Sequence, residues 1–143
     1  MEFKPYITKK NKRRNLSTKR DIIYIGKTEN VINKLPTEVE EMVKTNLQAL
    51  QYSKASSFCD LPDWTNQGKM TDKPLRGNKL EGTHQLTIKH RDSHRVIYVA
   101  TYDDLIFVIH CFKKKTEGRS TRDIKTVEQR YKTLKQDRES GKI

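Results

Sequence analysis

Three strand-like runs follow one another closely between residues 83 and 112, and they constrain the fold more than any other part of the chain. Each run is rich in β-branched and aromatic residues, as strands usually are. The runs are THQLTIK at 83–89, HRVIYVATY at 94–102 and LIFVIHCF at 105–112. The links at 91–93 and 103–104 contain aspartate and serine, which favour tight turns. Consecutive strands joined by tight turns predict an antiparallel meander.

One further strand and two helices accompany the meander. Residues 22–25 (IIYI) predict an early strand, and Pro36 and Ser120 each precede apolar residues spaced three or four apart, as in a helix. Ser120 is the expected N-cap, with an acid at Asp123 three residues later. The order predicts an α+β fold, in which a small antiparallel or mixed sheet of about four strands packs with a helix from the N-terminal half and a C-terminal helix.

Residues 53–74 interrupt these regular patterns. The segment is polar and longer than most connections in compact domains, so a functional loop, a second short element and a lid all remain open. Its one tryptophan, Trp64, is interpreted as an anchor that holds the segment to the core, with stacking on a nucleic-acid base as the alternative.

The positive charge is concentrated at the two ends of the chain. The whole chain carries +12, of which residues 1–20 contribute +7 and residues 113–143 contribute +6, so the middle is close to neutral. This pattern favours a polyanionic partner such as RNA, because cations that neutralise phosphates release bound counterions. A surface that only maintains solubility is the alternative.

The chain is expected to form one domain at 21–143 behind a basic arm at 1–20, mobile until an acidic partner meets it. Cys59 and Cys111 have no metal-ligand spacing, and they are expected to be the reduced thiols of a cytoplasmic protein. No apolar stretch reaches the roughly twenty residues of a membrane span. The sequence therefore predicts no membrane association, no metal and no cofactor.

The meander brings cations to one place if its strands pair as expected. Metal-free RNA cleavage needs a group that takes the 2′-OH proton, a cation that stabilises the charge on phosphorus, and a donor for the leaving 5′-oxygen. Lys89 and Arg95 flank one hairpin, and the lysine block 113–115 closes the neighbouring strand. Arg95 is assigned to the transition-state charge.

The proton-transfer group is less sharply defined. A lysine base needs its ordinary pKa of about 10.4 lowered by several units, which crowding by other lysines favours. Histidine needs no such shift, so His84, His94 and His110 are rival candidates. A hydrogen-bonded structural role is the stronger reading for His110, inside an apolar run, and His94 beside Arg95 is the candidate to test first.

A series of short motifs in the last 65 or so residues resembles the RelE/HigB toxin superfamily, and most closely its phage-derived HigB-like branch. No single motif is specific, but their order and spacing together are. They are Lys79-Leu80, the strand from Leu86 to Lys89, His94-Arg95-Val96, His110-Cys111-Phe112, Lys114-Lys115-Thr116, and Ile124 with the later Arg130.

The resemblance implies a RelE-like fold and a toxin of a toxin–antitoxin system that acts as a ribosome-dependent mRNA endoribonuclease. The implied partners are mRNA, the ribosomal A site with its rRNA, and an antitoxin, expected to be a small helix-turn-helix protein. The superfamily's functional cations correspond to Lys89, Arg95 and Lys114, and with His94 they form the expected catalytic set. Other basic side chains are expected to contact RNA, namely Arg76, Lys79, Arg91, Lys113, Lys115 and Arg119. The alternative is a noncatalytic phage or mobile-element protein of the same fold that binds nucleic acid or a host protein.

Overall fold

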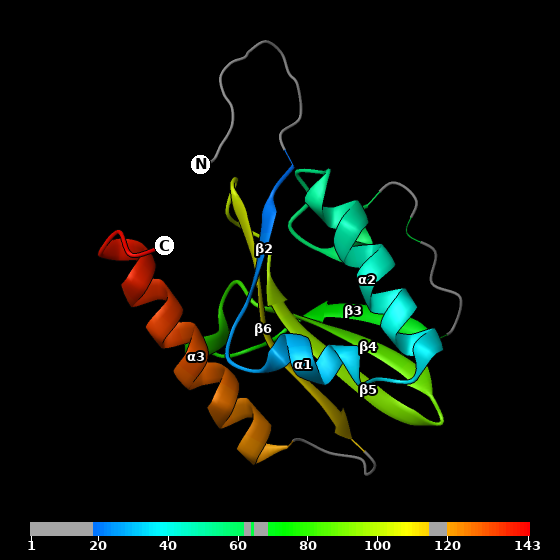
Figure 1. Ribbon diagram of the computed structural model, residues 1–143. Helices are drawn as coiled ribbons and strands as arrows, with labels where there is room; N and C mark the ends of the chain where they lie inside the picture. The colour runs from blue at the N-terminus through cyan, green and yellow to red at the C-terminus, as the bar shows by residue number, and fades with distance from the viewer. Residues whose placement is uncertain (1–18, 62–63, 65–68, 115–119) are drawn as a thin grey trace.

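The computed structural model describes residues 19–61, 64, 69–114 and 120–143. These residues form an α+β fold built on a five-stranded mixed sheet with the strand order β2-β6-β5-β4-β3 (Figure 1). The strands are β2 (Asp21–Tyr24), β3 (Met70–Pro74), β4 (His84–His90), β5 (Asp92–Val99) and β6 (Leu105–Lys114). The helices are α1 (Thr28–Asn33), α2 (Thr37–Gln51) and α3 (Thr121–Glu139), with short 3-10 turns at η2 (Phe58–Asp60) and η3 (Asn78–Leu80).

The predicted meander is confirmed. Strand β4 pairs antiparallel with β5, and β5 pairs antiparallel with β6. The early strand β2 lies parallel to β6 at one edge of the sheet. Arg91, with φ 67°, forms the turn between β4 and β5, so β5 begins at Asp92, before the expected start at His94. The mixed sheet is therefore the one that the order of elements predicted, with one strand added.

That added strand is β3, which lies inside the segment that the sequence left open. It pairs antiparallel with β4, from Met70 opposite Ile88 to Pro74 opposite His84. Its sequence, MTDKP, contains Asp, Lys and Pro, which are depleted in strands. A proline is tolerated because β3 is an edge strand. Of the three possibilities that the sequence left open for this segment, the structure shows a second short element at residues 70–74.

Helices cover both faces of the sheet (Figure 1). Helices α1 and α2 pack on one face, where the buried side chains include Leu86, Val96 and Tyr98 of the sheet. Helix α3 packs on the other face, against Ile97 and Phe107. We call these the α2 face and the α3 face. The expected helical stripes are buried for the most part, at Val39, Val43, Leu47 and Leu50 in α2 and at Val127, Tyr131 and Leu134 in α3.

A bulge in β6 changes which side chains reach the α3 face. Ile97 pairs with His110 and Tyr98 pairs with Val108, so Ile109 is an extra residue on β6. Ile109 packs in the core beneath α3, and His110 also contacts α3 through Asp123. Because a bulge breaks the two-residue alternation, two consecutive side chains face the same helix.

Arg20, at the end of the predicted arm, lies inside the fold with 3% of its surface exposed. Its guanidinium donates hydrogen bonds to four backbone carbonyls, those of Leu50, Ala55, Ala100 and Tyr102, at 2.8–3.2 Å. The rest of the predicted arm, up to residue 18, lies outside the described residues. In the described part of the chain, no helix combines the length and apolar character that crossing a membrane requires.

Candidate functional site

A cleft of about 580 Å³ opens on the α3 face. Its lining comes from β3, β4, β5, β6, the segment that follows β3, and the beginning of α3. Three of the side chains are basic, Lys73, Arg76 and Arg95, and none of the described residues that line the cleft is acidic. Phe112 and Ser120 border the same space. The cleft therefore has the charge that an anionic ligand requires.

The register of the meander places two more cations on the face of the sheet that carries Arg95, although neither of them lines the cleft. Arg95 lies between Thr87 of β4 and Phe112 of β6. One step further along, Ser93 lies between Lys89 and Lys114. Side chains that are opposite one another across strands share a face, and so do residues two apart on one strand, at a spacing of about 7 Å. Lys89, Arg95 and Lys114 therefore lie on the same face of the sheet, as their positions in the three strands predicted.

Arg95 has unused hydrogen-bonding capacity. Its Nε is buried and has no hydrogen-bond partner among the described residues. A buried donor without a partner costs about 1–3 kcal/mol, and an anion that accepts from it recovers that cost. Arginine can bind a phosphate through two parallel N–H donors. Among the side chains that line the cleft, Arg95 is therefore the one best suited to bind a phosphate.

Phe112 provides an aromatic surface beside Arg95. It is half-buried, it lines the cleft, and its ring stacks on His110 with 5.3 Å between centroids and 23° between planes. An aromatic ring next to a guanidinium suits a single-stranded nucleotide, because the base can stack while the phosphate is neutralised.

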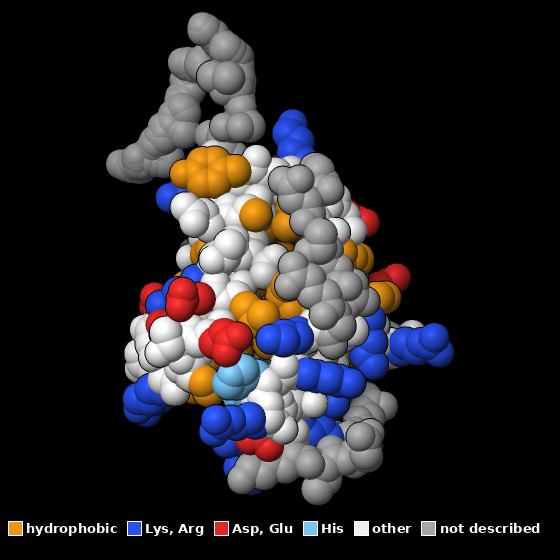
Figure 2. Space-filling view, turned by 90° about the vertical axis from the view of Figure 1, so that its right-hand side faces the viewer, with side chains coloured by type: hydrophobic (Ala, Val, Ile, Leu, Met, Phe, Trp, Pro, Cys, Tyr) orange, Lys and Arg blue, Asp and Glu red, His pale blue; other side chains and the backbone are white. Residues whose placement is uncertain are grey.

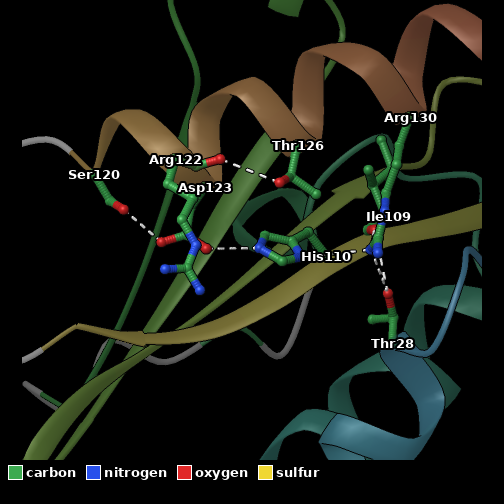
Figure 3. Close-up of polar contacts among 8 residues, drawn as sticks. All are labelled: Thr28, Ile109, His110, Ser120, Arg122, Asp123, Thr126 and Arg130. Carbon is green, nitrogen blue, oxygen red and sulfur yellow. Dashed lines mark hydrogen bonds and ion pairs between the residues drawn. The ribbon is translucent and has the colours of Figure 1, made fainter.

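A polar network joins the cleft to the start of α3 (Figure 3). The carboxylate of Asp123 accepts a short hydrogen bond from the hydroxyl of Ser120 and is 2.8 Å from Nε2 of His110. Partial burial raises the pKa of Asp123, but the hydrogen bonds from Ser120 and His110 outweigh it and hold that pKa below its usual range. Ser120 is the N-cap residue, as predicted, yet its hydroxyl bonds to Asp123 and caps no backbone N–H.

Arg130 completes this network on the side of β6. Its Nη1 donates to the carbonyl of Ile109 at 2.8 Å and to the hydroxyl of Thr28 at 3.2 Å (Figure 3). The same atom is 3.4 Å from Nδ1 of His110, so Nδ1 accepts and Nε2 donates to Asp123. His110 therefore has the hydrogen-bonded structural position that the sequence favoured, and the network fixes Ser120 at the rim of the cleft.

The structure separates His94 from the expected catalytic set. His94 is 3% exposed and lies on the α2 face, opposite to Arg95, because adjacent residues of a strand point to opposite faces. His84 also lies on the α2 face, where its Nδ1 is 3.6 Å from the carboxylate of Asp72. Asp72 in turn accepts a hydrogen bond of 2.7 Å from the buried hydroxyl of Tyr98. Of the three candidate histidines, His110 alone shares the face of Arg95.

The residues expected to bind RNA fall into three places. Arg76 lines the cleft, whereas Lys79 borders a separate groove with Lys125, Lys132 and Lys135 on α3. Arg91 and Lys113 line a pocket at the β4–β5 hairpin end of the sheet, on the other side from the cleft. Lys115 and Arg119 lie outside the described residues. Figure 2 shows lysine and arginine side chains concentrated in the lower half of the face that carries this hairpin.

The described residues give little support for metal-dependent chemistry or for a cysteine nucleophile. They contain no group of three or more His, Cys, Asp or Glu side chains that is arranged to hold a metal ion. Cys111 is buried in the core, and burial raises the pKa of its thiol to about 12. Cys59 is exposed; a hydrogen bond with Ser57 lowers its thiol pKa, but partial desolvation and the nearby Asp72 outweigh that effect and leave the pKa above its ordinary value. Neither thiol is prepared to act as a nucleophile.

The fold and the basic cleft define a small α+β protein suited to an anionic ligand. Residues 30–132 match the family model described as "Phage derived protein Gp49-like (DUF891)". Because the match covers more than two thirds of the chain, the protein belongs to this Gp49-like family, which is a family of RelE/HigB-like toxins. None of the curated proteins compared with the chain matches it. Membership of a toxin family implies an antitoxin partner.

Proposed function

We propose that this protein is the toxin of a toxin–antitoxin pair and that it cleaves ribosome-bound mRNA in the cleft around Arg95. The observation that carries the proposal is the buried Nε of Arg95, which has no partner among the described residues and lies in a cleft whose described lining has no acidic residue. Family membership supports the toxin class, and the cleft supports RNA as the substrate.

The proposed reaction is attack by a 2′-oxygen on the adjacent phosphorus. A base takes the 2′-OH proton, the new oxygen–phosphorus bond forms, and the bond to the 5′-oxygen breaks as an acid protonates it. Arg95 stabilises the negative charge that builds on the phosphate oxygens. Loss of one such donor costs on the order of 10²–10³ in rate. The products are a 2′,3′-cyclic phosphate and a 5′-hydroxyl.

Lys89 and Lys114 flank Ser93 in the next row of the sheet, and we assign the two proton transfers to this pair. Lys73 and Arg76, at the β3 side of the cleft, bind the flanking phosphates in this account. Phe112 stacks on one base. His94 has no part in the reaction, since it lies on the α2 face.

Inducible expression in a bacterial host tests the proposal. We expect the wild type to arrest growth and to create new mRNA 5′ ends at in-frame positions. Arg95→Ala and Lys114→Ala should relieve the arrest while the proteins stay folded. Arg138→Ala is the matched control, because Arg138 pairs with Asp104 near the far end of α3 and does not line the cleft.

Equal toxicity of Arg95→Ala and wild type would refute the assignment of Arg95. Normal growth with intact mRNA for the wild type would refute the nuclease and favour the alternative, a noncatalytic protein that binds nucleic acid or a host protein. Binding by that alternative should weaken steeply with salt, with no RNA cut. A neighbouring gene for a small helix-turn-helix protein would supply the antitoxin to be tested.

A further inference from the structure

A second pocket, of about 540 Å³, lies across the sheet from the cleft. Its apolar lining comes from Val31, Leu35 and Pro36 around α1 and from Cys111 and Phe112 of β6. Val31 is 41% exposed, whereas none of the other described valine, leucine and isoleucine residues of the helices is exposed. We call this space the α1 pocket. An open apolar pocket with an exposed aliphatic side chain at its edge is the form of a protein-docking site.

The rim of the α1 pocket is basic. Lys34, Arg91 and Lys113 surround it, and the single acidic residue among the described lining is Asp92. The carboxylate of Asp92 is 3.6 Å from Nζ of Lys113, so one positive charge is partly neutralised and the others are left over. Charge complementarity therefore selects an acidic partner.

His94 supplies a polar group inside the same pocket. It lines the α1 pocket at 3% exposure, and its Nδ1 is buried without a hydrogen-bond partner among the described residues. A partner that hydrogen-bonds to this atom would satisfy a polar group that is otherwise unpaired. His94, which takes no part in the proposed reaction, can therefore contribute to the binding of a partner.

We propose that the α1 pocket receives an apolar side chain from an acidic segment of a partner protein. The apolar side chain fills the space beside Val31 and Leu35, flanking carboxylates meet the basic rim, and a polar group of the segment bonds to His94. The identity of that partner as the antitoxin rests on the proposed function; the pocket and its chemistry do not. Anchor side chains that fill desolvated pockets carry much of the energy of protein interfaces, and acidic motifs are recognised by clusters of basic side chains.

The α1 pocket and the cleft lie on opposite faces of the same strand, β6. Phe112 lines both cavities, and Lys113 and Lys114 at the end of β6 alternate between the two faces. A segment anchored in the α1 pocket therefore lies beside the strand that also carries Lys114.

Titration of the full chain by NMR tests the proposal with a defined probe. The probe is a blocked pentapeptide with one leucine between four acidic residues; one control replaces the leucine by serine, and another replaces the acids by lysines. We expect the acidic leucine peptide to shift the methyl signals of Val31 and the ring signals of His94. Both control peptides should bind at least about tenfold more weakly.

Two matched pairs of variants localise the site. Val31→Glu should weaken binding about tenfold, whereas Asn30→Glu, the same charge change at the adjacent exposed position of α1, should not. Lys113→Gln should weaken binding, whereas Lys125→Gln on α3 should not. The second pair decides the matter if Val31→Glu fails to fold.

Three results would overturn the proposal: no shift with the acidic leucine peptide, undiminished binding by both pocket variants, or stronger shifts at His94 with a single-stranded RNA oligonucleotide. The RNA result would make the pocket a nucleic-acid site. Because no cleavage is measured, failure of the nuclease proposal leaves this result unaffected, and failure of peptide binding leaves the nuclease proposal unaffected.

Discussion

Replacement of the buried Arg20 by methionine should destabilise the protein far more than its position near the start of the chain indicates. The guanidinium ties the end of α2, through the carbonyl of Leu50 at 2.8 Å, to the segment after β5, through the carbonyl of Ala100 at 2.9 Å. Both of these hydrogen bonds are buried. Methionine fills much of the same space but donates to neither carbonyl.

The magnitude follows from the two buried acceptors. Each buried carbonyl that loses its donor costs about 1–3 kcal/mol, so the two together cost about 2–6 kcal/mol. Water can reach the partly buried carbonyls of Ala55 and Tyr102, and methionine no longer requires burial of a charge. We therefore expect a loss of about 3 kcal/mol in the free energy of unfolding. For a chain of this size the midpoint temperature should fall by about 10 °C.

Urea denaturation at pH 7, followed by far-UV circular dichroism, measures this loss, and a thermal scan measures the midpoint. Lys19→Met is the matched control, because Lys19 is exposed next to Arg20, and it should change stability by no more than about 0.5 kcal/mol. Arg20→Lys keeps the charge with fewer donors and should be intermediate. If Arg20→Met is as stable as Lys19→Met, the four carbonyl contacts do not hold these segments together.

Three further perturbations test other parts of the account. Phe112→Ala should weaken binding of a labelled single-stranded RNA by about 1–3 kcal/mol in fluorescence anisotropy, whereas Phe112→Tyr should retain binding; equal affinity of all three proteins would exclude base stacking. Burial raises the pKa of Asp72, but hydrogen bonds, including the one from Tyr98, outweigh burial and lower that pKa. The ionised carboxylate therefore stabilises the fold above its unfolded pKa of about 3.9, and this stabilisation is lost as the pH falls through the lower folded pKa. Asp72→Asn should remove that part of the acid dependence in urea titrations from pH 7 to pH 2, and an unchanged pH profile would contradict the assignment. Gly26→Ala should lower the free energy of unfolding by about 1–2 kcal/mol in a urea titration, because φ is 61° and the added Cβ would lie 2.9 Å from a guanidinium nitrogen of Arg130; unchanged stability would show that this turn relaxes freely.

The regular patterns of the sequence predicted the elements that contain a full period. The meander and both long helices have enough residues to show alternation or a helical stripe, and each appears in the structure. Helix α1 has six residues, too few for a stripe. Strand β3 is held by backbone hydrogen bonds to β4, which its own side chains do not reveal. Both elements form through contacts with other segments, so the pattern of their own residues could not predict them.

The candidate site was predictable where it depends on strand register. The two-residue period together with the tight turns brings Lys89, Arg95 and Lys114 onto one face. The same two-residue period places His94 on the opposite face. Because β5 has apolar residues on both faces, its alternation is hard to see in the sequence, and the position of His94 was missed. The reverse happens at His110, which alternation alone would place on the α2 face and which the bulge at Ile109 turns toward α3.

The cleft itself depends on contacts between distant segments. It forms where the β3 side of the sheet meets the beginning of α3, and β3 was not predicted as a strand. The network of Ser120, Asp123 and His110 likewise requires α3 to cross β6 at one place. Such a crossing leaves no local pattern in the sequence. The sequence therefore identified Arg76 and Arg95, but neither Lys73 nor the space that these three side chains surround.

The most direct test of the central claim is cleavage of a defined mRNA on purified bacterial ribosomes, with one known codon in the A site. We expect the wild type to cut within that codon and leave a 5′-hydroxyl. Arg95→Ala should be slower by about 10²–10³, while Arg138→Ala should match the wild type. Cleavage by Arg95→Ala at the wild-type rate, or no cleavage by a folded wild type, would contradict the account.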